Sequence, residues 1–382
     1  MQKTQNASGH QKLLSLWIIV FISFSNSTFA NNLSSIKSEG TDLQLEKVAS
    51  GLNVPWGLAF LNEKQILITE RSGTLKLLDL QQSTIKSVAG VTPVWAQGQG
   101  GLLDVAVKLP YRTGDWIYFT YSKPLQDGAA TTLARSKLSN NQLHDWEDLV
   151  VTQSASTTSR HFGSRIAFSG DDTIFFTVGD RGDRSNGQRM NTHAGKVLRV
   201  DLSGKAKSDN PFVNMDNALP EIWSIGHRNP QGIAYDSEAK RLWTIEHGPR
   251  GGDEINLIKS GLNYGWPVVS HGKEYWGPVS VGESTEKAGM ENPKKVYIPS
   301  IAPSSLLLYT GNKIPNWKGN LLAGALAKTH LNRVALDRQG DLLKEERLLE
   351  ELGERIRDVI QGPDEFIYLS TDSGNVYRLR PK

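Results

Sequence analysis

The sequence contains no cysteine among its 382 residues. This absence excludes disulfide bonds, thiolate metal sites, a cysteine nucleophile and the motif for covalent haem attachment. A protein without disulfides must be stabilised by its core, and a chain of this length can bury a large one. Length alone is compatible with two ordinary domains or with one large repetitive domain.

The sequence also lacks a concentration of charge of one sign. Its 43 basic and 40 acidic residues are mixed along the chain, and the formal net charge is only +3. There is no basic run of the kind that binds nucleic acid, so we expect no nucleic-acid partner.

Long apolar runs are absent except near the start, where Leu13–Phe24 is apolar but too short to span a bilayer easily. Two lysines come before this run, and Thr28 and Ala30 stand at the small-residue positions of a cleavage site. This pattern predicts a secretory signal peptide over residues 1–30, cleaved after Ala30. The alternative is an uncleaved anchor. We expect the mature chain to be periplasmic or secreted, without stable membrane insertion.

Helical periodicity is scarce, and short apolar segments bounded by Gly, Asp, Asn or Ser predict an all-β protein. Four stretches resemble one another, and each contains two strands and a polar turn, usually followed by a third strand. They begin at Gly57, Arg165, Gly232 and Arg357. Two weaker copies begin at Gly101 and Ser304. Each unit has room for about four strands, as in a propeller blade.

We therefore expect one six-bladed β-propeller over residues 31–382. The segment Asp42–Ala49 is expected to pair with the C-terminal segment Asn375–Arg380 and close the ring, because closure removes an exposed sheet edge. A pair of β-sandwiches or a β-helix fits units of this length and strand count less well.

Polar residues stand just before the starts of these units, where a propeller gathers loops around one mouth of its channel. They are Gln97 and Gln99, His161, the group His227, Arg228, Asn229 and Gln231, and Arg355. Convergence from distant parts of the chain favours a binding site, and its arginines favour a ligand with several carboxylates or phosphates. The alternative is that these groups only satisfy buried strand ends. For His161 the same choice lies between a proton-transfer group and a structural histidine.

The segment Glu246–Pro267 contains Gly-Pro-x-Gly-Gly, which cannot form a regular strand. Loop carbonyls beside Asp253 and Glu254 would make a hard oxygen site suited to Ca²⁺, although acidic glycine-rich loops are often ordinary turns. The acidic segment Asp180–Arg184 also contains arginines, which favours a network of ion pairs over a metal site.

Eight motifs in this order resemble one known family over nearly the whole mature chain. They are "VPWGLAFL", "GQGGLLDVAV", "RHFGSRIAF", "GHRNPQGIAYD", "EHGPRGGDEIN", "LNYGWP", "IAPSS" and "RIRDVI". The family is that of the soluble, periplasmic sugar dehydrogenases that depend on pyrroloquinoline quinone (PQQ): the aldose sugar dehydrogenases and, more distantly, soluble glucose dehydrogenase. The resemblance implies a six-bladed propeller that oxidises the anomeric carbon of aldoses to lactones.

The resemblance also implies roles for individual residues. It makes His161 the general base and Arg228 the group that polarises the quinone and stabilises the developing oxyanion. It assigns Gln99, Asn229, Arg355 and Arg357 to PQQ, with Gln99 and Asp253 as substrate contacts. It makes Gly248 and Pro249 carbonyl ligands of the Ca²⁺ that binds PQQ, with Asp253 as its acidic neighbour, and it gives Glu254 and Tyr264 to a second, structural Ca²⁺.

Some positions depart from the glucose enzyme. A lysine that contacts PQQ there falls on Ala327, with Lys328 one place along, where its side chain would point to the other face of a strand. Arg160 replaces an acidic residue, and the aromatic wall appears as Val296–Ile301. These departures favour a broader aldose specificity over glucose.

Two other functions stay open. One is a non-catalytic sugar- or ligand-binding propeller that has lost PQQ, which the Ala327 departure allows. The other is a Ca²⁺-dependent propeller lactonase, which an arginine-rich channel disfavours because arginine repels a central cation. For the dehydrogenase, an external quinone or cytochrome must accept the electrons, because the chain has no haem attachment site.

Overall fold

The structure is a computed structural model that describes residues 1–2 and 33–382. The predicted signal peptide and its cleavage site therefore lie outside the described residues. Residues 33–382 contain 25 strands and three short 3₁₀ helices, η1 (Arg184–Gly187), η2 (Pro315–Trp317) and η3 (Glu350–Leu352). In this part of the chain no helix is long and apolar enough to cross a bilayer.

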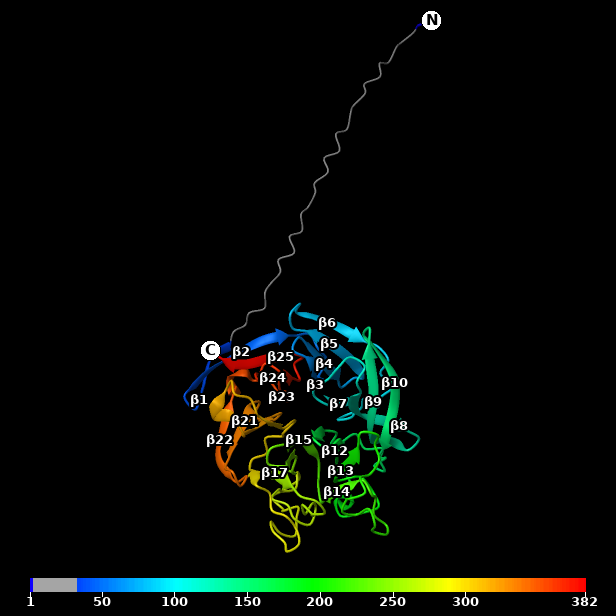
Figure 1. Cartoon of the computed structure of the whole chain (residues 1–382), viewed down its shortest axis with the longest axis vertical. Coiled ribbons are helices and arrows are strands. Elements are labelled where there is room, and N and C mark those ends of the chain that lie inside the picture. The colour runs from blue at the N-terminus through cyan, green and yellow to red at the C-terminus, as the bar shows by residue number, and fades with distance from the viewer. Residues whose placement is uncertain (3–32) are drawn as a thin grey trace. The chain divides into compact units, whose positions relative to one another are not determined.

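The strands form six antiparallel sheets, each built largely from consecutive strands (Figure 1). In chain order the sheets contain β3 (Pro55–Asn62), β4 (Gln65–Glu70), β5 (Thr74–Asp79) and β6 (Thr84–Val88); β7 (Leu102–Val107), β8 (Ile117–Leu125), β9 (Gly128–Ser139) and β10 (Gln142–Val151); β11 (Ile166–Ser169), β12 (Thr173–Val178), β13 (Lys196–Asp201) and β14 (Ile222–Ile225); β15 (Pro230–Asp236), β16 (Arg241–Glu246), β17 (Asp253–Ile258) and β18 (Lys295–Tyr297); β19 (Leu307–Leu308), β20 (Leu321–Gly324), β21 (Leu331–Leu336) and β22 (Leu342–Leu348); and β23 (Ile356–Gln361), β24 (Ile367–Thr371) and β25 (Val376–Pro381), joined by β1 (Leu33–Ser38) and β2 (Thr41–Ala49).

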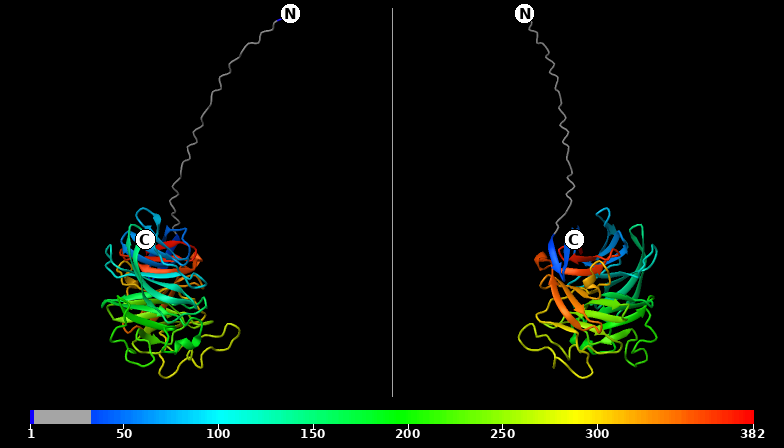
Figure 2. Two further views of the ribbon diagram at one scale, coloured as in Figure 1. Left: turned by 90° about the vertical axis from the view of Figure 1, so that its right-hand side faces the viewer. Right: turned by 60° about the vertical axis from the view of Figure 1, so that its left-hand side comes forward.

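The first strands of the six sheets contact one another in a closed ring, from β3 through β7, β11, β15 and β19 to β23 and back to β3. The remaining strands of each sheet radiate from this ring, as Figures 1 and 2 show. The predicted six-bladed β-propeller is thus confirmed. Each of the six unit starts found in the sequence falls within about three residues of the beginning of the first strand of a blade.

The ring is closed by strands from opposite ends of the chain. β2 pairs antiparallel with β25 along Leu43–Ala49, so the predicted closure is confirmed. The sequence did not predict β1, which pairs with β2 and makes the sixth blade five-stranded. Closure leaves no unpaired edge between the first and last blades.

The blades are held together by apolar side chains packed between neighbouring sheets. The middle strands are buried on both faces, and every residue of β12 is buried. This is why these strands read as continuous apolar runs rather than as alternating ones. The outer strand β6 is mostly exposed instead. The segments just before the first strands gather at one end of the channel, which we call the front end.

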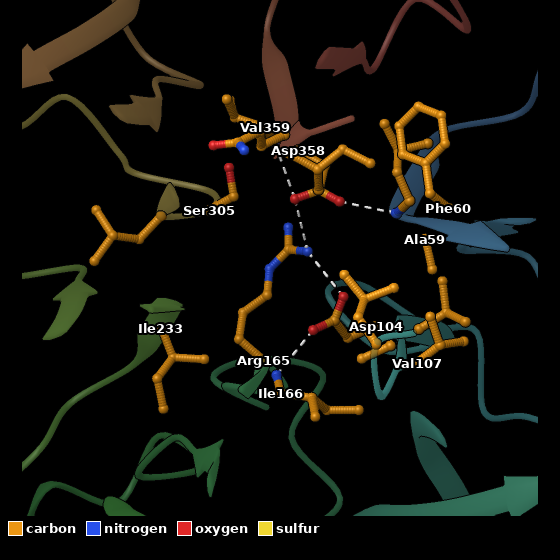
Figure 3. Close-up of a pocket in the computed structure, with 17 residues that line it drawn as sticks. Ala59, Phe60, Asp104, Val107, Arg165, Ile166, Ile233, Ser305, Asp358 and Val359 are labelled. Carbon is orange, nitrogen blue, oxygen red and sulfur yellow. Dashed lines mark hydrogen bonds and ion pairs between the residues drawn. The ribbon is translucent and has the colours of Figure 1, made fainter. Parts of the chain in front are cut away.

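Arg165, the residue before β11, lies on the axis of the propeller (Figure 3). Its Nη1 atom lies 3.1 Å from a carboxylate oxygen of Asp104 and 3.0 Å from one of Asp358. The guanidinium also stacks on the ring of Trp56, with its Cζ atom 4.0 Å from the ring centroid.

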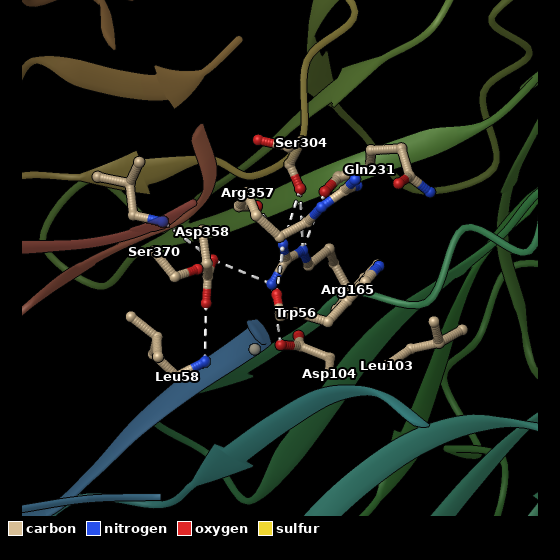
Figure 4. Close-up of polar contacts among 12 residues, drawn as sticks. Trp56, Leu58, Leu103, Asp104, Arg165, Gln231, Ser304, Arg357, Asp358 and Ser370 are labelled. Carbon is tan, nitrogen blue, oxygen red and sulfur yellow. Dashed lines mark hydrogen bonds and ion pairs between the residues drawn. The ribbon is translucent and has the colours of Figure 1, made fainter. Parts of the chain in front are cut away.

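The same guanidinium donates hydrogen bonds to main-chain carbonyls of other blades (Figure 4). Nε donates to the Gln231 carbonyl at 3.0 Å, and Nη2 donates to the carbonyls of Ser304 at 2.7 Å, Arg357 at 3.0 Å and Trp56 at 3.3 Å. Together with Asp104, these partners give Arg165 a contact to each of the other five blades. We call this residue and its partners the axial hub.

The carboxylates of the axial hub also fix neighbouring strand starts. Asp358 accepts a hydrogen bond from the Leu58 amide at 2.8 Å, and Asp104 accepts one from the Ile166 amide at 2.8 Å. Burial raises the pKa of Asp104 to about 6 and also raises the pKa of Asp358. The single guanidinium of Arg165 lowers both pKa values but does not cancel the effect of burial.

We expect Arg165→Met to lower the free energy of unfolding by about 3 to 5 kcal/mol, because it leaves two buried carboxylates without their counter-charge. Chemical denaturation checks this. The loss should be larger at pH 8 than at pH 5: carboxyls with raised pKa values destabilise the fold when ionised, and protonation relieves this. The exposed pair formed by Arg347 offers the control, and Arg347→Met should cost less than about 1 kcal/mol. If Arg165→Met lowered the free energy of unfolding by less than about 1 kcal/mol, the axial hub would be dispensable for stability.

Candidate active site

His161 lies at the front end of the channel, in the loop before β11. Its backbone adopts a left-handed conformation, with φ of 57°, and the residue as a whole is 8% exposed. The Gln99 side-chain oxygen accepts a hydrogen bond from the His161 amide at 2.7 Å. The loop is therefore held by a residue that precedes a different blade.

The His161 ring is oriented by Asp180. Nδ1 of His161 lies 2.6 Å from an Asp180 carboxylate oxygen, which also accepts from the Gly182 amide at 2.7 Å. The other Asp180 oxygen accepts from the Trp266 indole at 2.8 Å. An acidic partner at Nδ1 selects the tautomer with its proton there. Nε2, which has no hydrogen-bond partner among residues 33–382, is then free to accept a proton.

Burial lowers the pKa of His161, an effect that the hydrogen bond to Asp180 opposes. The imidazole is therefore neutral at pH 7, as a general base must be. Burial acts to raise the pKa of the Asp180 carboxyl, but His161, the Gly182 amide and the charge of Arg228 together outweigh burial and lower the pKa, so the carboxyl stays ionised.

Arg181 braces the His161 loop from behind. Its buried guanidinium donates to the carbonyls of Thr158, at 2.9 Å, and Arg160, and it stacks 3.5 Å from the centroid of the Phe162 ring. These contacts hold the backbone before His161 and the aromatic side chain after it. They could not be predicted from the sequence, because nothing near Arg181 in the chain marks it as an arginine that binds carbonyls.

The prediction of an ion-pair network over Asp180–Arg184 is wrong for the first part of this segment. Asp180 binds the His161 ring and Arg181 binds carbonyls. Only the end of the segment forms exposed ion pairs: Arg184 with Glu274 at 2.7 Å, and Asp183 with Arg189 at 3.3 Å.

A cavity of about 340 Å³ opens beside the His161 loop, and we call it the front pocket. Four residues predicted to bind a cofactor line it: Gln99, Asn229, Arg355 and Arg357. Three residues that the sequence reasoning did not single out also line it: Arg71, His247 and Asp372.

The front pocket carries an excess of positive charge. Arg355 and Arg357 share one counter-ion, Asp372, with Nε–carboxylate distances of 2.8 and 2.7 Å. Arg71 adds a third guanidinium, whose Nη1 donates to the Gly98 carbonyl at 2.6 Å. Three guanidinium groups against one carboxylate favour an anionic ligand.

The amides of the front pocket serve both the fold and the pocket. The Asn229 side-chain oxygen accepts from the Gly163 amide at 3.1 Å, as the Gln99 oxygen does from the His161 amide. Both side chains thus steady the His161 loop. Their NH₂ groups have no hydrogen-bond partner among residues 33–382, so both can donate to a ligand.

Arg228 lies next to the front pocket, on the wall of a second and much smaller cavity of about 10 Å³. Its Nη1 donates to the His247 carbonyl at 3.1 Å, and its guanidinium faces the Trp266 ring at 5.4 Å. His247 lines both cavities. The small cavity is also lined by four predicted metal-site residues: Gly248, Pro249, Glu254 and Tyr264.

Asp253 does not line either cavity. Its buried carboxylate accepts four hydrogen bonds at 2.8 to 3.0 Å, from the amides of Gly248, Ile301 and Ala302 and from the Ser300 hydroxyl. Its geometry is that of a positioning residue for the loop with Gly248 and Pro249, and it places no oxygen where a sugar could reach it.

Glu254 presents an uncompensated carboxyl group to the small cavity. It forms no ion pair within residues 33–382. Burial together with the nearby Glu246 raises its pKa well above the usual range, an effect that the Asn256 side chain opposes without cancelling. The Tyr264 hydroxyl is used elsewhere, since it donates to the Leu257 carbonyl at 2.7 Å. No cluster of three acidic or histidine residues suited to a metal occurs in the described chain.

Ala327 lies beside the front pocket but is not among its lining residues; Leu326 lines it instead. The Ala327 amide donates to the Ile301 carbonyl at 2.9 Å. Lys328 is exposed, with φ of 68°, and does not line the pocket. The lysine expected from the glucose enzyme therefore has no equivalent in the pocket.

Fold and site together define a six-bladed propeller with a histidine–aspartate pair next to an anion-binding pocket. The chain belongs to the glucose/sorbosone dehydrogenase family, whose family model matches residues 52–378. The resemblance drawn from the motifs is thus confirmed, and membership makes the protein an oxidoreductase that acts on sugars.

Individual relatives agree with this placement. The chain is 36% identical to an aldose sugar dehydrogenase of Escherichia coli over 359 residues, which cover 91% of this chain and 96% of the relative. A crystal structure of the soluble E. coli aldose sugar dehydrogenase in the apo form matches with a TM-score of 0.85 and 34% identity, covering 89% of this chain and all of that one. The PQQ-bound aldose sugar dehydrogenase of Streptomyces coelicolor matches with a TM-score of 0.75 and 25% identity, covering 89% and 98%.

We expect ¹⁵N NMR of the histidine rings to show His161 at pH 7 as a neutral ring with its proton on Nδ1. Its pKa should lie below 6.5, and it should fall further in Asp180→Ala because the carboxylate stabilises the imidazolium. His161→Gln assigns the signal. A ring that carries its proton on Nε2, or a pKa that rises when Asp180 is removed, would contradict this geometry.

Proposed function

We propose that the protein is a PQQ- and Ca²⁺-dependent dehydrogenase that oxidises the anomeric carbon of aldose sugars to lactones. The observation that carries the proposal is the His161–Asp180 pair, in which the Nε2 atom of His161 has no hydrogen-bond partner among residues 33–382. The loop that carries this pair is held by Gln99 and Asn229, which line the front pocket with its guanidinium groups. The PQQ-bound relative supports the identity of the cofactor.

The front pocket has the donors that PQQ needs. Arg71, Arg355 and Arg357 would bind its carboxylates, and the free amide groups of Gln99 and Asn229 would donate to its other oxygens. Asp372 binds both Arg355 and Arg357, so their guanidinium groups are already held in place and little rearrangement is required. PQQ, when bound, supplies a quinone that accepts two electrons.

The small cavity has the donors that Ca²⁺ needs. The chain turns tightly at Gly248, where an added Cβ would lie 2.0 Å from the Gly252 carbonyl oxygen. The carbonyls of Gly248 and Pro249 would be the main-chain ligands. Because its pKa is raised, the Glu254 carboxyl would carry negative charge only when a cation lies beside it. A small cavity lined by oxygen atoms beside an anion-binding pocket suits a hard cation.

In this proposal Nε2 of His161 accepts the proton of the anomeric hydroxyl group. Loss of this proton makes the anomeric carbon a better hydride donor, and Asp180 stabilises the imidazolium that forms. The Arg228 guanidinium stabilises negative charge that develops at the neighbouring acceptor oxygen. We assign no substrate contact to Asp253, in line with its saturated carboxylate.

The proposal extends to the surroundings of the reaction. We propose a periplasmic or secreted protein, from the signal-peptide pattern over residues 1–30, and an external quinone or cytochrome as electron acceptor. The departures at Arg160 and Val296–Ile301 leave aldoses as a class, not glucose alone, as the substrate.

We expect calorimetric titration of the metal-free protein to show PQQ binding at micromolar concentration or tighter when Ca²⁺ is present. Arg357→Ala should weaken binding by about tenfold to a hundredfold, because a guanidinium–carboxylate hydrogen-bond pair is lost. Arg347→Ala, which changes an arginine outside the pocket, is the matched control. No PQQ binding with or without Ca²⁺ would refute the cofactor assignment.

We expect His161→Gln to lower kcat for dye-linked aldose oxidation in the reconstituted protein by about 10²- to 10⁴-fold. The substitution at the exposed His144 in β10, His144→Gln, should leave kcat unchanged. In the unmodified protein kcat/KM should rise with pH through the lowered pKa of His161 and level off by neutrality, because the neutral ring is the active form. Full activity of His161→Gln, or kcat/KM falling over this range, would remove His161 from the mechanism.

A further inference from the structure

A second cavity opens at the other end of the channel, and we call it the back pocket (Figure 3). Its volume is about 210 Å³. It is lined by later residues of the first strands, such as Phe60, Val107 and Ile360. The front pocket is lined instead by residues before or near the starts of the first strands, such as Gln99, and by residues just after the second strands, such as Arg71. Corresponding positions of neighbouring first strands contact each other, which places the two pockets at opposite ends.

The axial hub separates the two pockets. Arg165, Asp104 and Asp358 line the back pocket but not the front pocket. The guanidinium lies across the channel and is bonded to carbonyls on several sides. The back pocket is thus a compartment of its own, outside the candidate active site.

The floor of the back pocket has an excess of negative charge. Asp104, Asp358 and Arg165 are the charged groups among its lining residues, and two carboxylates against one guanidinium leave a formal charge of −1. All three side chains are more than nine-tenths buried. A buried net charge without a counter-ion favours a cationic ligand.

A second and independent feature of the wall is Ser305. Its residue is 2% exposed, and its hydroxyl has no hydrogen-bond partner in the structure although it lines the back pocket. A buried hydroxyl without a partner costs free energy, which a ligand with a hydrogen-bond donor would recover.

The remaining wall is apolar apart from Gln361, whose side-chain oxygen already accepts hydrogen bonds from the amides of Thr310 and Gly311. It includes Ala59, Phe60, Val107, Ile233, Leu306 and Ile360. A metal ion such as Ca²⁺ needs six to eight oxygen ligands, and the side chains of this wall do not supply them. An anion would meet the net negative charge. A sugar would leave most of its hydroxyl groups against hydrocarbon.

We propose that the back pocket binds a small alkylammonium ion. The ammonium group donates to the carboxylates of Asp104 and Asp358 and to the Ser305 hydroxyl, and the alkyl chain packs against the apolar wall. The volume suits a small organic molecule rather than a single water or bare ion. This site is independent of PQQ and of the sugar.

Ligand-observed NMR titration of the purified, cofactor-free protein with n-butylammonium tests the proposal. Its neutral and anionic analogues are 1-butanol and butyrate. We expect butylammonium to bind at least about tenfold more tightly than 1-butanol, because charged hydrogen bonds are added, and butyrate not to bind. Binding should weaken about tenfold from pH 8 to pH 5, as Asp104 protonates.

Variants locate the site. Val107→Trp, which fills the pocket mouth, should abolish binding, whereas Val151→Trp, at an exposed position of β10, should leave it unchanged. Ser305→Ala should weaken binding about tenfold. Thermal unfolding confirms that each variant folds, and the ligand series and pH series on the unmodified protein need no variant.

The proposal is overturned if butylammonium does not bind, if 1-butanol binds equally well, or if Val107→Trp folds and still binds it. It is also overturned if Ca²⁺ displaces butylammonium at equal concentration. None of these outcomes bears on PQQ binding at the front pocket, so the two proposals fail separately.

Discussion

The fold depends on the charged side chain of Arg165, which lies at the centre of the propeller, where most domains place apolar side chains. Arg165 alone bonds to residues of all the other blades, and it does so through directional hydrogen bonds and ion pairs. Apolar contacts between blades tolerate sliding, but a guanidinium with fixed donor directions fixes the level at which six first strands meet. Its burial carries a desolvation cost, which the two carboxylates and the carbonyls offset.

The axial hub also determines what the channel can bind. Arg165 lies four residues after His161. The strand start that Arg165 anchors is therefore the base of the loop that carries the imidazole. In front of the hub, guanidinium groups outnumber carboxylates; behind it, carboxylates outnumber the single guanidinium. A continuous tunnel would let these opposite charges neutralise each other through mobile ions. A closed centre keeps two compartments of opposite charge in one small domain.

The sequence predicted the blades because their pattern is local and is repeated six times. It predicted the ring closure because an open ring would leave a sheet edge exposed. It missed contacts that join residues far apart in the chain. The sequence pattern marks Arg165 only as the start of a repeated unit, and its partners lie as far along the chain as Asp358. Asp180 was placed in an ion-pair network, because nothing in its neighbours shows that it faces His161. The motifs located the candidate site residues, but they do not show what each side chain contacts. Asp253 lies beside the loop with Gly248 and Pro249, and its carboxylate accepts hydrogen bonds that hold this part of the chain.

Two roles were considered for the polar residues of the front pocket: satisfying strand ends and binding a ligand. The geometry of Gln99 and Asn229 allows one side chain to serve both roles. Gln99 and Asn229 each use the amide oxygen to hold the His161 loop, and each keeps the amide nitrogen for the pocket. Asp372 accepts hydrogen bonds from Arg355 and Arg357 and leaves other N–H groups of both guanidinium groups able to donate to a ligand. Such side chains link the position of the proton acceptor to the shape of the pocket, because a ligand that pulls on the amide nitrogen also pulls on the loop. A structural role for these side chains therefore does not exclude a binding role: they hold the backbone of the His161 loop, while Asp180 orients the ring.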